Sequence, residues 1–234
     1  MFLNRRKFIS RVCLSSALTA LTPVSLRAES YVVQKGDTLS RIATRFGISV
    51  ADLKFRNQLP SNLIRVGQNL IIPSLNAEVA RVKEITSRIK INKSKWKYLV
   101  AHHSATPHGN AKSYDRVDRQ HGMENGLAYH FVIGNGLDSG DGEIEIGTRW
   151  TCQIHGGHVR KWEFNNHGIG ICLVGNFEEQ KPTPKQMDSL KALVGFLAED
   201  LLGGKYTFLV HKEINPTLCP GKHFPTEEMH RLCR

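Results

Sequence analysis

Three features that would assign this chain of 234 residues to a particular class of protein are missing from it. It has neither interleaved aromatic and basic residues nor a recognition-helix pattern, so nucleic acid is not an expected partner. Its five cysteines are irregularly spaced and do not form the framework of a disulfide-stapled domain. The apolar run Val12–Leu21 is too short for a stable membrane span, so no span is expected in the mature protein.

Acidic residues are also absent from the first 28 positions, which hold five basic residues. The whole chain has a formal charge of +11, and the 27 basic and 21 acidic residues after position 28 leave a net charge of +6. A moderately basic protein suits an anionic surface such as a cell-wall polymer.

Residues 1–28 combine a basic start, an apolar segment and a small residue at the end, which together predict an export signal. Arg5-Arg6-Lys7-Phe8 resembles the twin-arginine signature, although Asn4 stands where Ser or Thr is usual. The cleavage point stays open, because Leu26 departs from the small-x-small pattern before Ala28, and an uncleaved N-terminal anchor is the alternative. We expect an exported protein that is periplasmic or associated with the cell wall.

Residues 29–74 show short, regularly patterned elements in the order strand, helix, helix, strand. A strand is predicted at Tyr31–Gln34, and a turn at Lys35–Asp37 leads to a helix capped by Asp37-Thr38. A second helix is predicted from Ser49, and the strand Asn69–Ile72 closes the unit. About 43 residues make a small but plausible domain.

The spacing of this segment resembles a LysM module throughout. The matching motifs are Tyr31-x-Val33-x-x-Gly36-Asp37-Thr38-Leu39-x-x-Ile42-Ala43 and Ile64-x-Val66-Gly67-Gln68-x-Leu70-x-Ile72-Pro73. The resemblance implies binding of glycans that contain N-acetylglucosamine, such as peptidoglycan, with Gly36, Asp37 and Thr38 lining the groove. Leu39, Ile42, Leu53 and Ile72 are expected in the core.

Residues 75–95 form a basic connector in which Val79, Val82, Ile85 and Ile89 recur at helical spacing. We expect a helical spacer that packs loosely on one domain.

In residues 96–234, predicted strands and helices alternate, which favours an α/β (α+β) domain with a central mixed sheet flanked by helices. Trp96–Ala101, Tyr129–Ile133, Ile169–Val174 and Tyr206–Val210 are the predicted strands. Thr183-Pro184-Lys185-Gln186 has the form of a capping box, and the helix that it opens is predicted to end at Gly203-Gly204.

Three side chains of this domain predict a metal site. His102 and His211 each follow an apolar strand, and Cys219 lies eight residues after His211 in a loop rich in Pro and Gly. Two adjacent strand ends can present two imidazoles to one zinc ion, and the cysteine loop can supply the third ligand of an open site. Strand-end histidines that are only hydrogen-bonded polar residues are the alternative.

The same domain resembles the zinc-dependent N-acetylmuramoyl-L-alanine amidases, a family shared by phage lysozyme-type amidases and peptidoglycan recognition proteins. Five motifs carry the resemblance in order: Leu99–Thr106, Tyr129–Ile133, Gly157-His158, Asn165–Gly175 and His211–Gly221. It implies Zn²⁺ bound by His102, His211 and Cys219, with Tyr129 as the catalytic tyrosine that positions or deprotonates a water. Thr217 falls on the position that holds the oxyanion, where phage enzymes often carry Lys. His158 and Asn165 are expected to contact substrate, and Cys172 to be an inert core thiol.

These observations predict a monomeric, exported hydrolase that binds peptidoglycan through LysM and cleaves the amide between N-acetylmuramic acid and L-alanine. Two alternatives remain open: a recognition protein that binds peptidoglycan without hydrolysis, and an amidase that recycles anhydro-muropeptides. Cys219 argues against the first, while the export signal and LysM argue against the second. The pairing of Cys152, Cys172 and Cys233 is left open.

Overall fold

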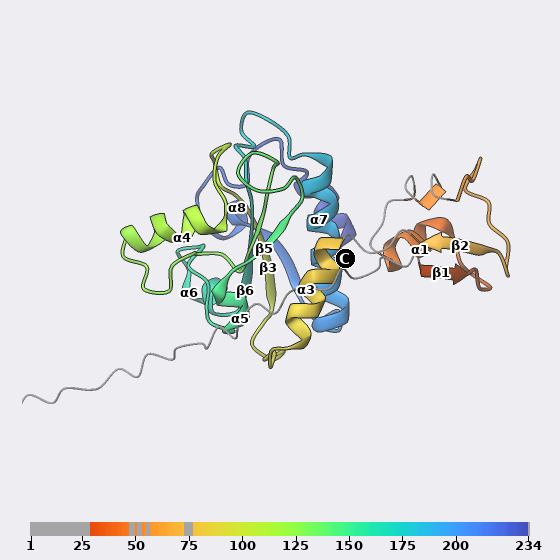
Figure 1. The fold of residues 1–234 in the computed structure, drawn as a ribbon, viewed down its shortest axis with the longest axis horizontal. Coiled ribbons are helices and arrows are strands. Elements are labelled where there is room, and N and C mark those ends of the chain that lie inside the picture. The colour runs from red at the N-terminus through yellow and green to blue at the C-terminus, as the bar shows by residue number, and fades with distance from the viewer. Residues whose placement is uncertain (1–28, 47–49, 51–52, 55–56, 73–76, 234) are drawn as a thin grey trace, which may run out of the picture.

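The computed structural model describes residues 29–46, 50, 53–54, 57–72 and 77–233 (Figure 1). The predicted export signal lies outside these residues, and the predicted second LysM helix lies largely outside them. Among the described residues, no helix has the length and apolarity that crossing a membrane requires.

The N-terminal unit is a two-stranded antiparallel sheet with a helix packed on it. Strand β1 (Glu29–Val32) pairs with β2 (Asn69–Ile72), and helix α1 (Leu39–Arg45) lies between them in sequence. Thr38 caps α1 by accepting a hydrogen bond from the Arg41 N–H at 3.2 Å, as the sequence predicts. The unit has its own core, which includes the expected residues Leu39, Ile42, Leu53 and Ile72.

Asn57 joins the helical segment at Leu53 to strand β2. Its amide nitrogen donates to the carbonyls of Leu53 and Ile71, both at 2.8 Å, and its amide oxygen accepts from the Ile71 N–H at 2.6 Å. One side chain thereby ties the helical segment to β2, which matters in a domain too small to have a large core.

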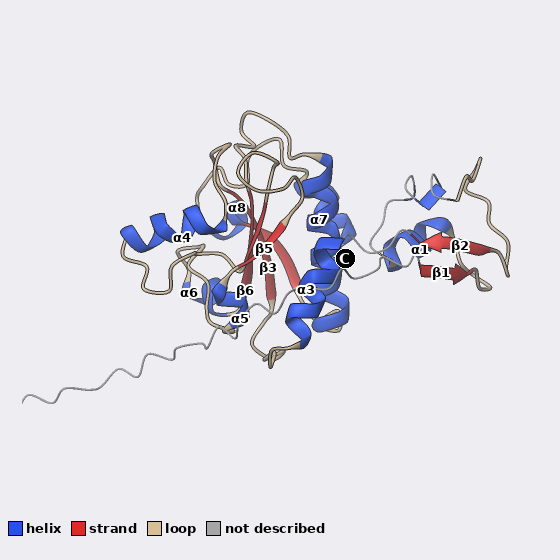
Figure 2. Ribbon diagram, in the orientation of Figure 1, coloured by secondary structure: helices blue, strands red, loops and turns tan. Residues whose placement is uncertain are grey.

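A five-stranded mixed sheet forms the centre of the larger unit, in the order β5-β4-β6-β3-β7 (Figure 2). Its strands are β3 (Tyr98–His103), β4 (Phe131–Ile133), β5 (Ile144–Ile146), β6 (Gly168–Leu173) and β7 (Thr207–Val210). Only the outer pair β4–β5 is antiparallel. Every residue of β6 is buried, as its continuous apolar run predicts. The predicted mixed sheet with flanking helices is confirmed.

Alternation along the strands divides the sheet into two faces. One face carries Leu99, Ala101, Ile169 and Ile171 in the main core, where it is covered by helices α3 (Ala77–Ser87), α7 (Pro184–Gly195) and α9 (Thr226–Leu232). Towards the other face lie helices α4 (Ala111–Gln120), α6 (Trp162–Asn166) and α8 (His211–Ile214). A short helix, α5 (Thr148–Thr151), follows β5. On this second face Val100, Val132 and Cys172 form smaller clusters, which leaves room for polar side chains at the strand ends.

Helix α7 begins at the predicted capping box, in which Thr183 and Gln186 exchange hydrogen bonds. It continues as the π-helical segment η1 (Phe196–Leu201), and the chain turns at the left-handed residues Gly203 and Gly204. The predicted end of this helix agrees with the structure.

The expectation of a loosely packed spacer at residues 75–95 is wrong. Helix α3 forms there as predicted, but Val79 and Val82 are completely buried and belong to the main core of the larger unit. The indole N–H of Trp150 also donates to the Thr86 hydroxyl at 3.0 Å. Periodicity indicates a helix with an apolar side, but it does not show how tightly that side packs.

Helix α3 also supplies hydrogen-bond partners to the edge strand β5 of the sheet. The Glu78 carboxylate accepts a hydrogen bond from the Ile144 N–H at 3.1 Å, and the Arg81 guanidinium donates to the Ile144 carbonyl. Because Ile144 begins the edge strand β5, these bonds pair backbone groups that the sheet leaves without a partner strand. The helix is therefore part of the larger unit.

Candidate metal centre

The sheet register brings His102 and His211 together. Ala101 of β3 lies opposite Val210 of β7 in a parallel pair, so the next residue on each strand, His102 and His211, follows at the same level. His211 is also the first residue of α8. Two histidines that are 109 positions apart in the sequence thus meet at the carboxyl ends of adjacent strands, as the sequence predicts.

The loop after α8 returns Cys219 to the same point. The Lys212 N–H donates to the Cys219 carbonyl at 2.9 Å, and the Cys219 N–H donates to the Thr217 hydroxyl at 3.2 Å. The thiol accepts a hydrogen bond from the backbone N–H of His103 at 3.4 Å. Sequence reasoning missed this last contact, because a backbone donor leaves no residue pattern.

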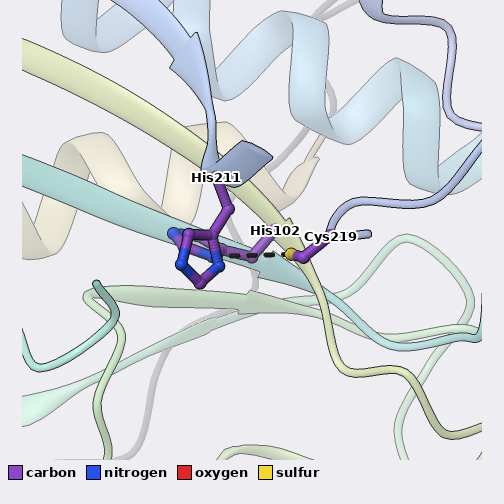
Figure 3. Close-up of side chains that lie close together, drawn as sticks. All are labelled: His102, His211 and Cys219. Carbon is purple, nitrogen blue, oxygen red and sulfur yellow. Dashed lines mark hydrogen bonds between the residues drawn. The ribbon is translucent and has the colours of Figure 1, made fainter. Parts of the chain in front are cut away.

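The ligand atoms of His102, His211 and Cys219 all lie within 4.8 Å of one another (Figure 3). The Nδ1 atom of His102 is 3.2 Å from Nδ1 of His211 and 3.7 Å from the Cys219 sulfur. His102 is completely buried, Cys219 is buried and His211 is half-buried. The cluster is therefore accessible from the His211 side.

This donor set fits a zinc ion. Two imidazoles and one thiolate form a three-ligand site that leaves a fourth position open. Burial lowers the pKa of His102 well below its ordinary value and also lowers that of His211, so both rings are neutral and can offer a lone pair. Burial raises the pKa of the Cys219 thiol to about 12, so this side chain needs a cation to become a thiolate.

Tyr129 lies beside the cluster, just before β4. Its ring centroid is 5.3 Å from that of His102, and the side chain is half-buried. The neighbouring His130 points into the protein, where it contacts Trp96 and is completely buried. Of these two neighbours, only His130 is fully buried. Burial, followed by the nearby Cys172 and Cys219, raises the pKa of the Tyr129 phenol well above its usual value. The phenol is thus a hydrogen-bond donor at neutral pH.

Substrate contact by His158 and Asn165 stays a prediction, and the structure buries both side chains. His158 is 5% exposed, and its Nδ1 lies 3.0 Å from Nε2 of His102, behind that ligand. Both polar atoms of the Asn165 side chain bond to the backbone of Val159, at 3.1 and 2.6 Å, and the residue is buried. Each of these polar groups has a hydrogen-bond partner inside the protein.

The other predicted site residues lie on exposed turns. Thr217 is exposed in the Cys219 loop, where its hydroxyl accepts the Cys219 N–H and keeps its own proton to donate. In the N-terminal unit, the Asp37 carboxylate accepts from the Tyr31 hydroxyl at 2.6 Å and from the Gln34 N–H at 2.8 Å. Gly36 adopts a φ of 91°, which a side chain would strain, and Thr38 caps α1. Contact of Gly36, Asp37 and Thr38 with a glycan stays a prediction.

Comparison with known proteins gives two family matches. Residues 31–73 match the LysM domain, and residues 92–222, more than half of the chain, match N-acetylmuramoyl-L-alanine amidase.

Among curated relatives, peptidoglycan-recognition protein LB of Drosophila melanogaster is 29% identical over 137 residues, covering 53% of this chain and 54% of that protein. Peptidoglycan recognition protein 3 of Mus musculus is 30% identical over 97 residues, covering 41% of this chain and 25% of that protein. The match thus spans between a quarter and about half of these two relatives.

Among solved structures, the endolysin N-acetylmuramoyl-L-alanine amidase LysCS from Clostridium intestinale URNW superposes with a TM-score of 0.51 at 31% identity. The match covers 58% of this chain and 82% of that one. The matched family region contains His102, His211 and Cys219 together with Tyr129. On this evidence the chain belongs to the N-acetylmuramoyl-L-alanine amidase family, with a LysM domain preceding its amidase domain.

Proposed function

We propose that this protein is a zinc-dependent N-acetylmuramoyl-L-alanine amidase that cleaves the amide between N-acetylmuramic acid and the L-alanine of the stem peptide. The observation that carries the proposal is the convergence of His102, His211 and Cys219 within 4.8 Å, in a cluster accessible from one side. Three protein ligands with an open fourth position are typical of a hydrolytic zinc site, whereas structural zinc sites are closed by four.

Each residue has a role that amide hydrolysis requires. Zinc bound by the three ligands would activate a water and polarise the scissile carbonyl. Tyr129, a protonated phenol 5.3 Å from the His102 ring, would orient that water by hydrogen bonding. Thr217 retains a hydroxyl proton beside Cys219 and would donate it to the oxyanion of the tetrahedral intermediate.

Peptidoglycan is the partner that the LysM and amidase domains share, which places the protein at the cell wall or outside the cell. The LysM domain would hold the glycan strand and raise the local concentration of the stem peptide at the amidase domain. The basic, acid-free residues 1–28 support export through a twin-arginine signal to the periplasm or the wall. One chain supplies all three metal ligands, so we propose that the protein acts as a monomer.

Digestion of purified peptidoglycan tests the reaction. Products are labelled at free amines and at reducing sugar ends and identified by mass spectrometry. The proposal expects free stem peptides that begin with L-alanine, without new reducing ends. New reducing ends without free peptides would show cleavage of the glycan and overturn the amidase assignment.

A second candidate is a recognition protein that binds peptidoglycan without cleaving it, since the curated relatives carry the name peptidoglycan-recognition protein. The buried thiol of Cys219, together with both histidines, favours the enzyme. Zinc content decides cheaply between the two: about one zinc per chain, lost in Cys219→Ser, supports the enzyme. The recycling of anhydro-muropeptides is the third possibility, and the LysM domain favours the polymeric wall over it.

A further inference from the structure

His158 contacts one member of the metal cluster from behind. Its Nδ1 lies 3.0 Å from Nε2 of His102, and its Nε2 lies 3.4 Å from the Gly168 carbonyl oxygen. The two rings meet edge to face, with centroids 4.9 Å apart. Both side chains are buried, with 0% exposure for His102 and 5% for His158. This series of contacts ends at a backbone carbonyl, which can only accept a hydrogen bond.

The Gly168 carbonyl determines which nitrogen of each imidazole ring carries the proton. A carbonyl oxygen only accepts, so Nε2 of His158 carries a proton, and the neutral ring then has a bare Nδ1. The bare Nδ1 accepts from Nε2–H of His102, which leaves Nδ1 of His102 with a lone pair. This is the atom that faces His211 and Cys219.

The surroundings of His158 are shaped to hold its ring in this position. A Cβ at Gly170 would lie 2.4 Å from Cδ2 of His158, and one at Gly156 would lie 2.3 Å from the same atom. Both glycines have φ angles outside the left-handed region, so room for the ring, and not backbone conformation, is what they supply. The neighbouring His130 is fixed independently, because its Nδ1 accepts the Gly170 N–H at 3.0 Å and its Nε2 lies 3.2 Å from the Ile154 carbonyl.

We propose that His158 is a positioning residue. By donating to the Gly168 carbonyl and accepting from Nε2–H of His102, it holds His102 in the tautomer whose Nδ1 binds the metal. Partners of this kind orient a ligand ring and make it a better donor, and their loss typically weakens metal binding about 10–100-fold. This inference rests on the proposed metal centre, and it gives a buried histidine a role other than substrate contact.

The test compares three variants in chelator-treated, full-length protein. His158→Leu removes the acceptor, while His158→Asn keeps an acceptor oxygen close to the position of Nδ1. His167→Leu is the matched control, because His167 is half-buried and its Nδ1 lies 2.7 Å from the Lys95 carbonyl, away from the metal cluster. Zinc affinity is measured by competition with a chromophoric chelator, and the imidazole tautomers by ¹⁵N chemical shifts of histidine-labelled protein.

We expect His102 to be protonated on Nε2 in the wild type and in His158→Asn, and to become a mixture of tautomers in His158→Leu. Zinc affinity falls about 10–100-fold in His158→Leu, recovers most of this loss in His158→Asn and is unchanged in His167→Leu. Wild-type affinity in His158→Leu would overturn the proposal. Equal weakening in the Leu and Asn variants would also overturn it, because it would show that packing, and not the hydrogen bond, matters. Neither readout uses substrate, so an inactive enzyme with the expected zinc affinities would count against the proposed reaction alone.

Discussion

The Nδ1 atoms of His102 and His211 face each other at 3.2 Å, with the Cys219 sulfur 3.7 Å from the first of them. Neutral imidazoles can share at most one proton across this contact, which leaves the Cys219 sulfur outside it. A zinc ion held by His102, His211 and Cys219 would accept a lone pair from each of them, and its charge would lower the pKa of the buried thiol, which burial raises to about 12.

Cys219→Ser should therefore abolish stoichiometric zinc binding and the release of stem peptides. A hydroxyl does not ionise readily enough to replace the thiolate, so we expect zinc per chain to fall from about one to near zero in elemental analysis after dialysis. Cys233→Ser is the control, because Cys233 is a half-buried cysteine near Tyr206 and outside the cluster. A zinc content in Cys219→Ser equal to that of the control would remove Cys219 from the ligand set.

Tyr129→Phe should separate metal binding from catalysis. Removing the phenol hydroxyl leaves the ring packing and the three ligands in place, so zinc content and the melting temperature should stay at the wild-type level. The rate constant kcat for release of L-alanyl peptides should fall about 10²–10⁴-fold, the usual contribution of a positioned proton donor or acceptor. Tyr98→Phe, which removes a hydroxyl bonded to Glu163 on α6, should leave kcat unchanged. Full activity in Tyr129→Phe would exclude a role for the phenol.

The two histidines of the metal cluster could be predicted from the sequence because each follows a recognisable strand. An apolar run that ends in histidine places the side chain at a strand end, and parallel pairing brings such ends together, as Ala101 and Val210 show. The role of His158 could not be predicted in this way. Its partner lies 56 positions away, and the contact depends on the rotamer of His102 and on the space left by Gly156 and Gly170.

The tight packing of α3 could not be predicted from the sequence, for a different reason. Val79 and Val82 give the helix an apolar side, but only the tertiary structure shows that Thr86 meets Trp150 and that Arg81 meets the edge strand at Ile144. In the LysM domain, by contrast, Thr38 could be predicted as a cap because the capping hydrogen bond is local.

A single substitution at Asn57 should impair peptidoglycan binding by the LysM domain. Its side chain makes three hydrogen bonds that join Leu53 and Ile71, and a domain of this size has little other stabilisation. Asn57→Ala should therefore weaken binding to insoluble peptidoglycan in a co-sedimentation assay, while kcat/KM on a soluble muramyl peptide stays unchanged. Asn62→Ala, at an exposed position of the same domain, should change neither quantity. Unimpaired sedimentation of Asn57→Ala would argue against targeting by LysM.

The folded catalytic unit should begin at α3, ahead of the family match at residue 92. A chain of residues 75–234 should unfold in urea with the same stability as the amidase transition of the full protein, whereas residues 92–234 should lose at least about 3 kcal/mol. This estimate counts only Val79 and Val82, each contributing roughly 1.5–3 kcal/mol when fully buried. Val82→Ala should destabilise the longer chain, and Arg88→Ala, at an exposed ion pair with Glu84, should not. Equal stability of the two truncated chains would show that α3 is dispensable.

Acid should destabilise the metal-free protein through its buried histidines. His130 is the residue that tests this effect, because it is not one of the three metal ligands. Burial lowers the pKa of His130 well below 6.5, and protonation of its Nδ1 would break the hydrogen bond from the Gly170 N–H. The unfolded chain, with a histidine pKa near 6.5, then binds more protons than the folded one. The stability is thus fully present above about pH 6.5 and is lost as the pH falls, at about 1.4 kcal/mol per pH unit for each such histidine.

His130→Asn keeps an acceptor for Gly170 but cannot titrate, so it should reduce this slope by about one proton in urea unfolding measured between pH 7 and 5, even though its smaller volume lowers the stability at pH 7. His121→Asn provides the reference substitution, because His121 is exposed. A slope in His130→Asn equal to that of the wild type would mean that His130 does not stay neutral in the folded protein. The protonation states of the other buried histidines behind the metal cluster would then need revision. The first would be His158, whose ring centroid lies 6.1 Å from that of His130.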